Sequence, residues 1–161
     1  MSTNPIKRSK ALLRFSQEHH YGLLLVWKIK EGLKYHISAE RIADFTLFFY
    51  DNDLKHHFEK EETDLFEKLQ NNSTHYSKTL EEHEQLTSLI EKIRLNKKNS
   101  SLLNDFSELL EKHIRFEERE VFKFLENEFS EKELFDIAQK HEQKPIDISQ
   151  NWNDKFWILK K

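Results

Sequence analysis

Two stretches of this chain match each other: Leu54-Lys55-His56-His57-Phe58-Glu59-Lys60-Glu61-Glu62 and Leu110-Glu111-Lys112-His113-Ile114-Arg115-Phe116-Glu117-Glu118. In each copy a histidine precedes a glutamate by four residues, as His57 precedes Glu61 and His113 precedes Glu117. Side chains four residues apart lie on the same face of an α-helix, one turn from each other. The repeat therefore predicts two helices that each carry a histidine–glutamate pair able to bind one metal ion.

Around this repeat, apolar residues recur at helical spacing in four segments joined by short polar stretches. The segments cover about residues 10–33, 38–69, 76–93 and 102–128, with Ser38 as the expected N-cap of the second. The sequence has only two glycines and two prolines and is 34% charged, which favours helices over turn-rich sheets. We expect an all-α protein, an up-down-up-down four-helix bundle.

The chain continues past this bundle. Ser130 and Glu133 form a capping-box pattern, which predicts a fifth, short helix that fades before Pro145. The tail beyond it holds three large aromatic residues, which we expect to pack against the bundle or against another subunit: Trp152, Phe156 and Trp157. The length of 161 residues suits a single domain over residues 1–161, with the bundle at about 10–128.

Composition excludes several kinds of function. The absence of cysteine excludes disulfides, thiolate metal sites and cysteine nucleophiles, so any metal must be held by nitrogen and oxygen. A formal net charge of −3, with lysine and arginine spread along the chain, indicates neither nucleic acid nor an anionic membrane as a partner. The longest apolar run, Leu23–Trp27, is far shorter than the roughly 20 residues of a membrane span. Residues 7–13 start like a signal peptide, but Arg14 interrupts the apolar part, so we expect a cytoplasmic protein.

The other two segments each offer one histidine, in the dipeptides Glu18-His19 and Glu82-His83. His19 shares its stripe with Leu12, Val26 and Leu33, whereas the stripe of His20 includes Trp27 and Lys34, so His19 is the better core candidate. We expect Glu18 and Glu82 to be solvated. The remaining histidines are expected at the surface or partly buried, without a metal role: His20, His36, His56, His75 and His141.

Each of these inward histidines, taken alone, would more often be a core residue that is hydrogen-bonded to a neighbour. Taken together, four histidines and two glutamates replace apolar residues at middle positions of four helices. Burying two uncompensated carboxylates would cost several kcal/mol each, a cost that a pair of cations removes. A nitrogen and oxygen ligand set without sulfur suits iron or manganese, and zinc also fits by affinity.

The ordered set of these motifs resembles the hemerythrin-like, HHE cation-binding family over about residues 10–128. The resemblance implies a four-helix bundle around a non-haem di-iron site. It also implies that His19, His57, His83 and His113 are terminal ligands and that Glu61 and Glu117 are bridging carboxylates. Two positions depart from the family's oxygen carriers. Thr87 stands where they have a second histidine on the third helix, and their last carboxylate lies five residues past its histidine, which would select Glu118 over Glu117.

Losing one imidazole leaves coordination positions for water or a small ligand, which weakens the case for a dedicated oxygen carrier. We therefore expect a di-iron protein that binds or senses oxygen or a related small molecule, or that handles iron. A second hypothesis is a di-iron enzyme that reduces peroxide or oxidises ferrous iron. A third is a metal-free helical interaction module. Tyr50 and Tyr76 each lie seven residues before a predicted ligand and could hydrogen-bond near the site.

Overall fold

The computed structural model describes residues 8–69, 72–141 and 143–158, and within these ranges the chain forms helices and no strand. The α-helices are α1 (Leu13–Lys34), α2 (Ala39–Phe49), α3 (Lys55–Lys60), α4 (Phe66–Leu69), α5 (Ser73–Leu95), α6 (Ser100–Phe116), α7 (Phe122–Glu128) and α8 (Glu131–Lys140). Three π-helical segments, η1 (Tyr50–Leu54), η2 (Glu61–Leu65) and η3 (Glu117–Val121), and one 3₁₀ turn, η4 (Ile148–Asn151), complete the set. The prediction of an all-α protein is confirmed. In the described part of the chain, no helix combines the length and the apolar character needed to cross a membrane.

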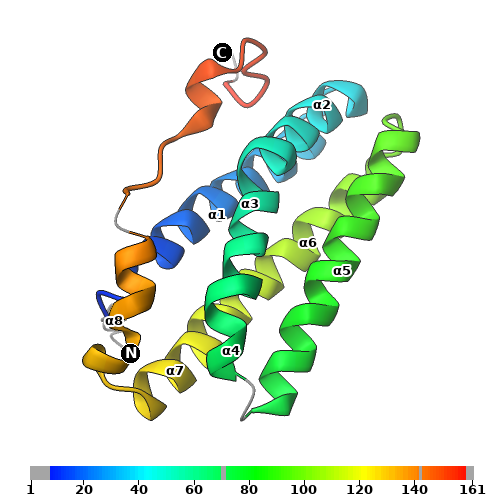
Figure 1. Ribbon diagram of the computed structural model, residues 1–161. Coiled ribbons are helices and arrows are strands. Elements are labelled where there is room, and N and C mark those ends of the chain that lie inside the picture. The colour runs from blue at the N-terminus through cyan, green and yellow to red at the C-terminus, as the bar shows by residue number, and fades with distance from the viewer. Residues whose placement is uncertain (1–7, 70–71, 142, 159–161) are drawn as a thin grey trace, which may run out of the picture.

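The helical stretches formed by α1, by α2 to α4, by α5 and by α6 with α7 lie side by side (Figure 1). Helix α1 packs along α6, α6 packs along α5, and α2 contacts α1, α5 and α6. Helix α4 contacts α5 at the other end of the molecule. Residues far apart in the sequence therefore meet along the middle of these stretches.

Asparagine side chains cap the N-termini of helices α5 and α6. The side chain of Asn72 accepts a hydrogen bond of 3.1 Å from the backbone N–H of His75, and Asn99 accepts from the N–H groups of Ser101 and Leu102. These contacts satisfy backbone donors that have no partner inside the helix. Ser38 occupies the N-cap position of α2, but its side chain makes no capping hydrogen bond. The polar stretch expected as a loop before the third segment is Asn71-Asn72-Ser73-Thr74. Asn71 lies outside the described residues, Asn72 caps α5, and the expectation of a loop is wrong for Ser73 and Thr74, which already belong to α5.

The expectation of uninterrupted α-helices over 38–69 and 102–128 is wrong, because η1, η2 and η3 interrupt them. Segments η2 and η3 begin at Glu61 and Glu117, the equivalent glutamates of the repeat. A π-helical turn takes up one more residue than an α-helical turn, and such turns often occur at functional sites. The extra residue brings two successive side chains of each copy into the core: Leu65 and Phe66 after Glu61, and Val121 and Phe122 after Glu117.

The apolar core consists of two clusters. One cluster includes Leu25, Leu54, Leu86 and Leu110 and lies toward the end of the molecule where α2 begins. The other includes Phe15 together with residues of α4, α7 and α8. Along each helical stretch, the predicted ligand positions fall between residues of one cluster and residues of the other. The polar positions are thus enclosed on both sides by apolar side chains.

The C-terminal region folds back onto these stretches. The predicted capping box is confirmed: Ser130 Oγ accepts from the N–H of Glu133, and the Glu133 carboxylate accepts from the N–H of Ser130. In the tail, the ring of Trp152 stacks on Phe48 with 4.7 Å between centroids, and Trp157 lies 4.8 Å from Phe45. The aromatic tail therefore packs against the helices of its own chain.

Candidate metal centre

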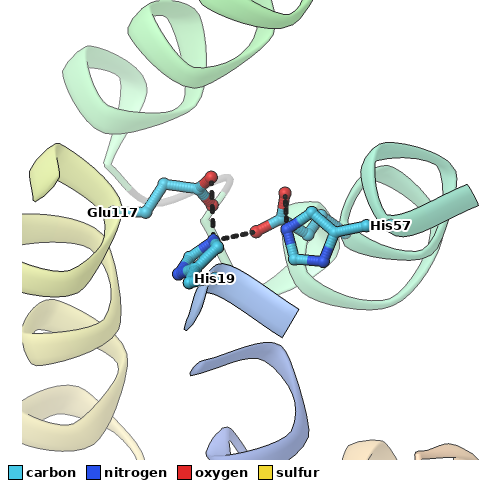
Figure 2. Close-up of side chains that lie close together, drawn as sticks. His19, His57 and Glu117 are labelled. Carbon is cyan, nitrogen blue, oxygen red and sulfur yellow. Dashed lines mark ion pairs between the residues drawn. The ribbon is translucent and has the colours of Figure 1, made fainter. Parts of the chain in front are cut away.

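Six polar side chains meet in the middle of the molecule, and none is more than 3% exposed. They are the six residues that the sequence predicts as metal ligands: His19 on α1, His57 on α3, Glu61 at the start of η2, His83 on α5, His113 on α6 and Glu117 at the start of η3. Figure 2 shows three of them, His19, His57 and Glu117, converging from separate helices. Their proximity results from the side-by-side packing of helices whose ligand-bearing turns stand at the same level.

The six residues divide into two overlapping groups. His19, His57, Glu61 and Glu117 form the first group, and His83 and His113 replace the two histidines in the second. Within each group, one candidate ligand atom per residue lies within 4.8 Å of all the others. Glu61 and Glu117 belong to both groups. The arrangement therefore suits two metal ions that share two carboxylates, with two imidazoles completing each ion's set.

In each of the four histidines of the site, the Nε2 atom faces the shared carboxylates. From Nε2 to the Glu61 carboxylate, the distance is 3.8 Å for His19, 3.1 Å for His57 and 3.3 Å for His83. From Nε2 to the Glu117 carboxylate, it is 3.6 Å for His19 and 2.5 Å for His113. The Nε2 atoms of His83 and His113 lie only 3.1 Å apart. Lone pairs of nitrogen and oxygen are thus concentrated in one buried volume.

The residues present fit a pair of cations. Both ring nitrogens of His19 and His57 and both carboxylate oxygens of Glu61 and Glu117 are buried and have no hydrogen-bond partner among the described residues. A buried carboxylate without hydrogen bonds is costly, and protein interiors rarely contain one without a compensating charge. Their contacts with histidine are ion pairs only when the imidazole is protonated. Cations would satisfy the two Nε2 atoms and the four carboxylate oxygens among these atoms without that proton.

The pKa values of the metal-free site reflect the close approach of its imidazoles and carboxylates. Burial opposes the charged form of His19, but contacts with Glu117 and Glu118 outweigh it and raise the pKa of His19 to about 9. Burial likewise opposes protonation of His83, and its contacts with Glu61 and Glu62 raise its pKa to about 9. Burial would raise the pKa of Glu117, yet the nearby His113 and His19 hold it well below its ordinary value. Metal ions compete with protons for these imidazoles.

A second set of carboxylates faces the Nδ1 atoms on the outer side of the four histidines. These outer carboxylates and their distances to Nδ1 are Glu18 to His57 at 3.2 Å, Glu62 to His83 at 3.0 Å, Glu82 to His113 at 3.0 Å and Glu118 to His19 at 3.4 Å. Burial alone would raise the pKa of Glu18 and of Glu118, but the contacts with His57 and His19 outweigh it and keep both pKa values below the ordinary value.

The expectation that Glu18 and Glu82 are solvated is therefore wrong. The sequence contained a signal that the prediction passed over, because each outer carboxylate is the chain neighbour of a predicted ligand: Glu18 of His19, Glu62 of Glu61, Glu82 of His83 and Glu118 of Glu117. A side chain one residue along a helix points about 100° away from its neighbour, toward the adjacent helix.

Two alternatives left open by the sequence can be compared with this geometry. Glu118 lies outside both groups of candidate ligands, and its carboxylate accepts a hydrogen bond of 2.9 Å from Ser16 Oγ. His20 is exposed, and its ring contacts that of Tyr21. These positions favour Glu117 over Glu118 and His19 over His20 as candidate metal ligands.

His141, expected at the surface or partly buried, is instead 4% exposed, and its Nε2 lies 2.8 Å from Asp64.

Thr87 stands beside a pocket of about 350 Å³ between α3 and α5 that reaches His83 and Glu62. The hydroxyl groups of Thr87 and Tyr50 are 3.0 Å apart, so the Tyr50 hydroxyl is directed to Thr87. The ring of Tyr76 packs on Phe66 with 5.5 Å between centroids. The pocket adjoins the position where the oxygen carriers have their additional histidine.

Comparison with known proteins identifies a family. Among curated proteins and among solved structures, no significant match to this chain was found. The family model described as "Hemerythrin HHE cation binding domain" matches residues 14–125, a span that begins in α1, ends in α7 and includes all six candidate metal ligands. Because this match covers well over half of the 161 residues and includes both copies of the His-x-x-x-Glu repeat, the chain belongs to the hemerythrin HHE cation-binding domain family.

Proposed function

We propose that this chain is a non-haem di-iron protein that binds or senses oxygen or a related small molecule, or handles iron. The observation that carries the proposal is the sharing of Glu61 and Glu117 between two groups that each contain two further histidines. Family membership supports cation binding. Iron is the favoured metal because the ligand set combines imidazole and carboxylate without sulfur, a set that manganese and zinc also accept.

The chain would supply each metal ion with two imidazole nitrogens and with oxygens of the two shared carboxylates. When bound, a pair of iron ions supplies reversible one-electron chemistry and coordination positions for a small ligand. Aromatic rings cover the histidines: Phe122 stacks on His19 with 5.3 Å between centroids, and Phe58 stacks on His83 at 4.1 Å. These rings exclude water from the imidazole faces and lower the local dielectric constant, which strengthens the attraction between opposite charges inside.

The position of Thr87 supports a small-molecule role for the centre. A threonine adds no imidazole at this point of α5, so fewer protein atoms are available to the metal ion that His83 and His113 would bind. The adjoining pocket reaches His83 from the solvent side. Both features favour a centre that remains accessible to small ligands.

We further propose the up-down-up-down order for the ligand-bearing helical stretches. The contacts of α1 with α2, of α4 with α5 and of α5 with α6 support it, because each stretch then packs against the next one in the chain.

Metal content and the ultraviolet–visible spectrum of protein purified in air test the proposal. We expect about two irons per chain and charge-transfer bands that bleach on anaerobic reduction. The chain offers matched controls, since exposed histidines adjoin two of the proposed ligands. His19→Ala and His57→Ala should each lower the iron content and alter the bands, whereas His20→Ala and His56→Ala should leave both unchanged.

Other results would change the assignment. Stoichiometric zinc without these bands would keep the ligand set but remove the redox functions. Consumption of hydrogen peroxide by the iron-loaded chain, lost in Glu61→Ala, would identify an enzyme. Protein that takes up neither iron nor zinc would overturn the proposal and favour a metal-free interaction module.

A further inference from the structure

The outer carboxylates connect the ligand-bearing helices in a closed ring. Each helix or π-helical segment provides a carboxylate to the histidine of another: Glu18 of α1 to His57 of α3, Glu62 of η2 to His83 of α5, Glu82 of α5 to His113 of α6, and Glu118 of η3 to His19 of α1. No histidine of the site is held by a carboxylate of its own helix on the outer side. The ring is therefore a property of the assembled molecule.

Two of the contacts select one form of the imidazole. The Nδ1 atoms of His83 and His113 lie within hydrogen-bond distance of Glu62 and Glu82, and an ionised carboxylate can only accept, so Nδ1 must carry the proton there. Glu118 and Glu18, at 3.4 and 3.2 Å from Nδ1 of His19 and His57, favour a proton on the same atom by charge. With the proton on Nδ1, the neutral imidazole keeps a lone pair on Nε2, which is the atom directed to the shared carboxylates in all four histidines. Contacts of this type also raise the basicity of a metal-bound imidazole.

The ring also sets the charge of the centre. Together with Glu61 and Glu117, the outer carboxylates bring six negative charges when all are ionised, and neutral imidazoles add none. Two ferric ions carry six positive charges, whereas two ferrous ions carry four. The negative charge of these carboxylates, offset in part by Arg8 at 3.9 Å from Glu118, therefore favours the higher charge of the oxidised pair.

Resting on the proposed function that a metal pair binds here, we propose that Glu18, Glu62, Glu82 and Glu118 are positioning residues that hold the four histidines with Nε2 inward and stabilise the oxidised iron pair. The solvent exposure of the outer carboxylates predicts which of them affects the metal centre more strongly. Glu62 and Glu82 lie at the same distance from their histidines, 3.0 Å, but the side chain of Glu62 is 40% exposed and that of Glu82 is 13% exposed. Water screens Glu62 more strongly, so Glu82 should have the larger effect.

The test uses the full chain, loaded anaerobically with ferrous iron, with Glu→Gln variants at positions 62 and 82. Glutamine keeps an oxygen acceptor but removes the charge. Glu82→Gln should weaken ferrous iron binding roughly 10–100-fold, measured by competition with a chelator, and should raise the midpoint potential of the centre. Glu62→Gln should shift both in the same direction by less, and Glu82→Asp, which retains the charge, should restore the potential toward that of the wild type.

Glu81→Gln is the matched control, because Glu81 is exposed and adjoins Glu82 on α5. Zinc-loaded protein with ¹⁵N-labelled histidine reports the tautomers directly, and wild-type protein should show Nδ1 protonated in all four ligands. If wild-type protein binds iron but Glu82→Gln matches Glu81→Gln in affinity and potential, the positioning role is overturned and the proposed function stands. If wild-type protein binds no metal, both are overturned.

Discussion

At the scale of single residues, side chains of other elements approach the backbone of α1 closely at its two glycines. A Cβ atom on Gly22 would lie 2.8 Å from Cδ1 of Ile114, the end of one side chain. A Cβ atom on Gly32 would lie 2.8 and 2.9 Å from two atoms of Ile42 and 2.9 Å from Cε1 of Phe156. A small change in the side-chain torsion of Ile114 relieves the first contact, whereas two packed side chains would have to move to relieve the second.

We therefore expect Gly22→Ala to leave the free energy of unfolding within about 1 kcal/mol of wild type, because the better helix propensity of alanine offsets the displacement of Ile114. Gly32→Ala should lower that free energy by about 1–3 kcal/mol through overpacking. Urea unfolding of the metal-free protein, followed by circular dichroism, measures both values. A Gly32→Ala variant at least as stable as Gly22→Ala would contradict this order.

At the scale of elements, α8 is tied to the rest of the molecule by the residue that follows it. His141 packs on Phe15, with 4.3 Å between ring centroids, and its Nε2 lies 2.8 Å from a carboxylate oxygen of Asp64 in η2. Burial lowers the pKa of His141 below its ordinary value of 6.5 even though Asp64 and Glu18 favour the charged form, and Lys60 also opposes protonation. The folded chain therefore binds this proton less readily than the unfolded chain.

This difference predicts a pH dependence. The neutral imidazole contributes stability that is fully present above about pH 6.5, the unfolded pKa, and is lost as the pH falls through the lower folded pKa. The stability advantage of wild-type protein over a His141→Gln variant should therefore shrink between pH 7.5 and pH 5. Thermal unfolding of both metal-free proteins across this range measures it. An advantage that grows as the pH falls would show instead that a charged pair with Asp64 dominates.

At the scale of the whole molecule, the candidate metal centre lies between the two apolar clusters and joins α1, α3, η2, α5, α6 and η3. A ligand that binds only the folded state stabilises that state by mass action. Without metal, the buried atoms of Glu61 and Glu117 have no hydrogen-bond partner in the described part of the chain. Metal should therefore contribute to the stability of the entire fold.

Removal of metal with a chelator should lower the melting temperature. At a free metal concentration of 100 times Kd the stabilisation is about 2.7 kcal/mol, which corresponds to a shift of roughly 5–10 °C for a chain of this size. Differential scanning calorimetry with and without chelator measures the shift. Glu117→Ala, which removes a shared carboxylate, should show little response to the chelator, and a wild-type melting temperature insensitive to chelator would argue against metal binding.

Much of the site was predictable because its ligands follow helical spacing. The four-residue separation of His57 from Glu61 and of His113 from Glu117 places each pair on one helix face whatever the rest of the fold does. The placement of His19 on an apolar stripe identified it over His20 by the same periodicity. Local spacing was therefore enough to predict the helical class and to place these residues on core-facing stripes, and the resemblance to a known family implied the complete set of six that the structure brings together.

The tertiary structure alone decided what surrounds these six residues. The prediction that Glu18 and Glu82 are solvated was wrong because a residue beside a ligand points away from the ligand's own stripe, and only helix packing decides whether water or a neighbouring histidine lies there. The same reason applies to His141, which becomes buried when α8 folds back. The π-helical turns at Glu61 and Glu117 also escaped the sequence, since a hydrophobic pattern gives the period of a helix but not the one-residue change of register that tertiary packing imposes. The sequence by itself thus determined which atoms could bind metal, and packing between helices decided how those atoms are held.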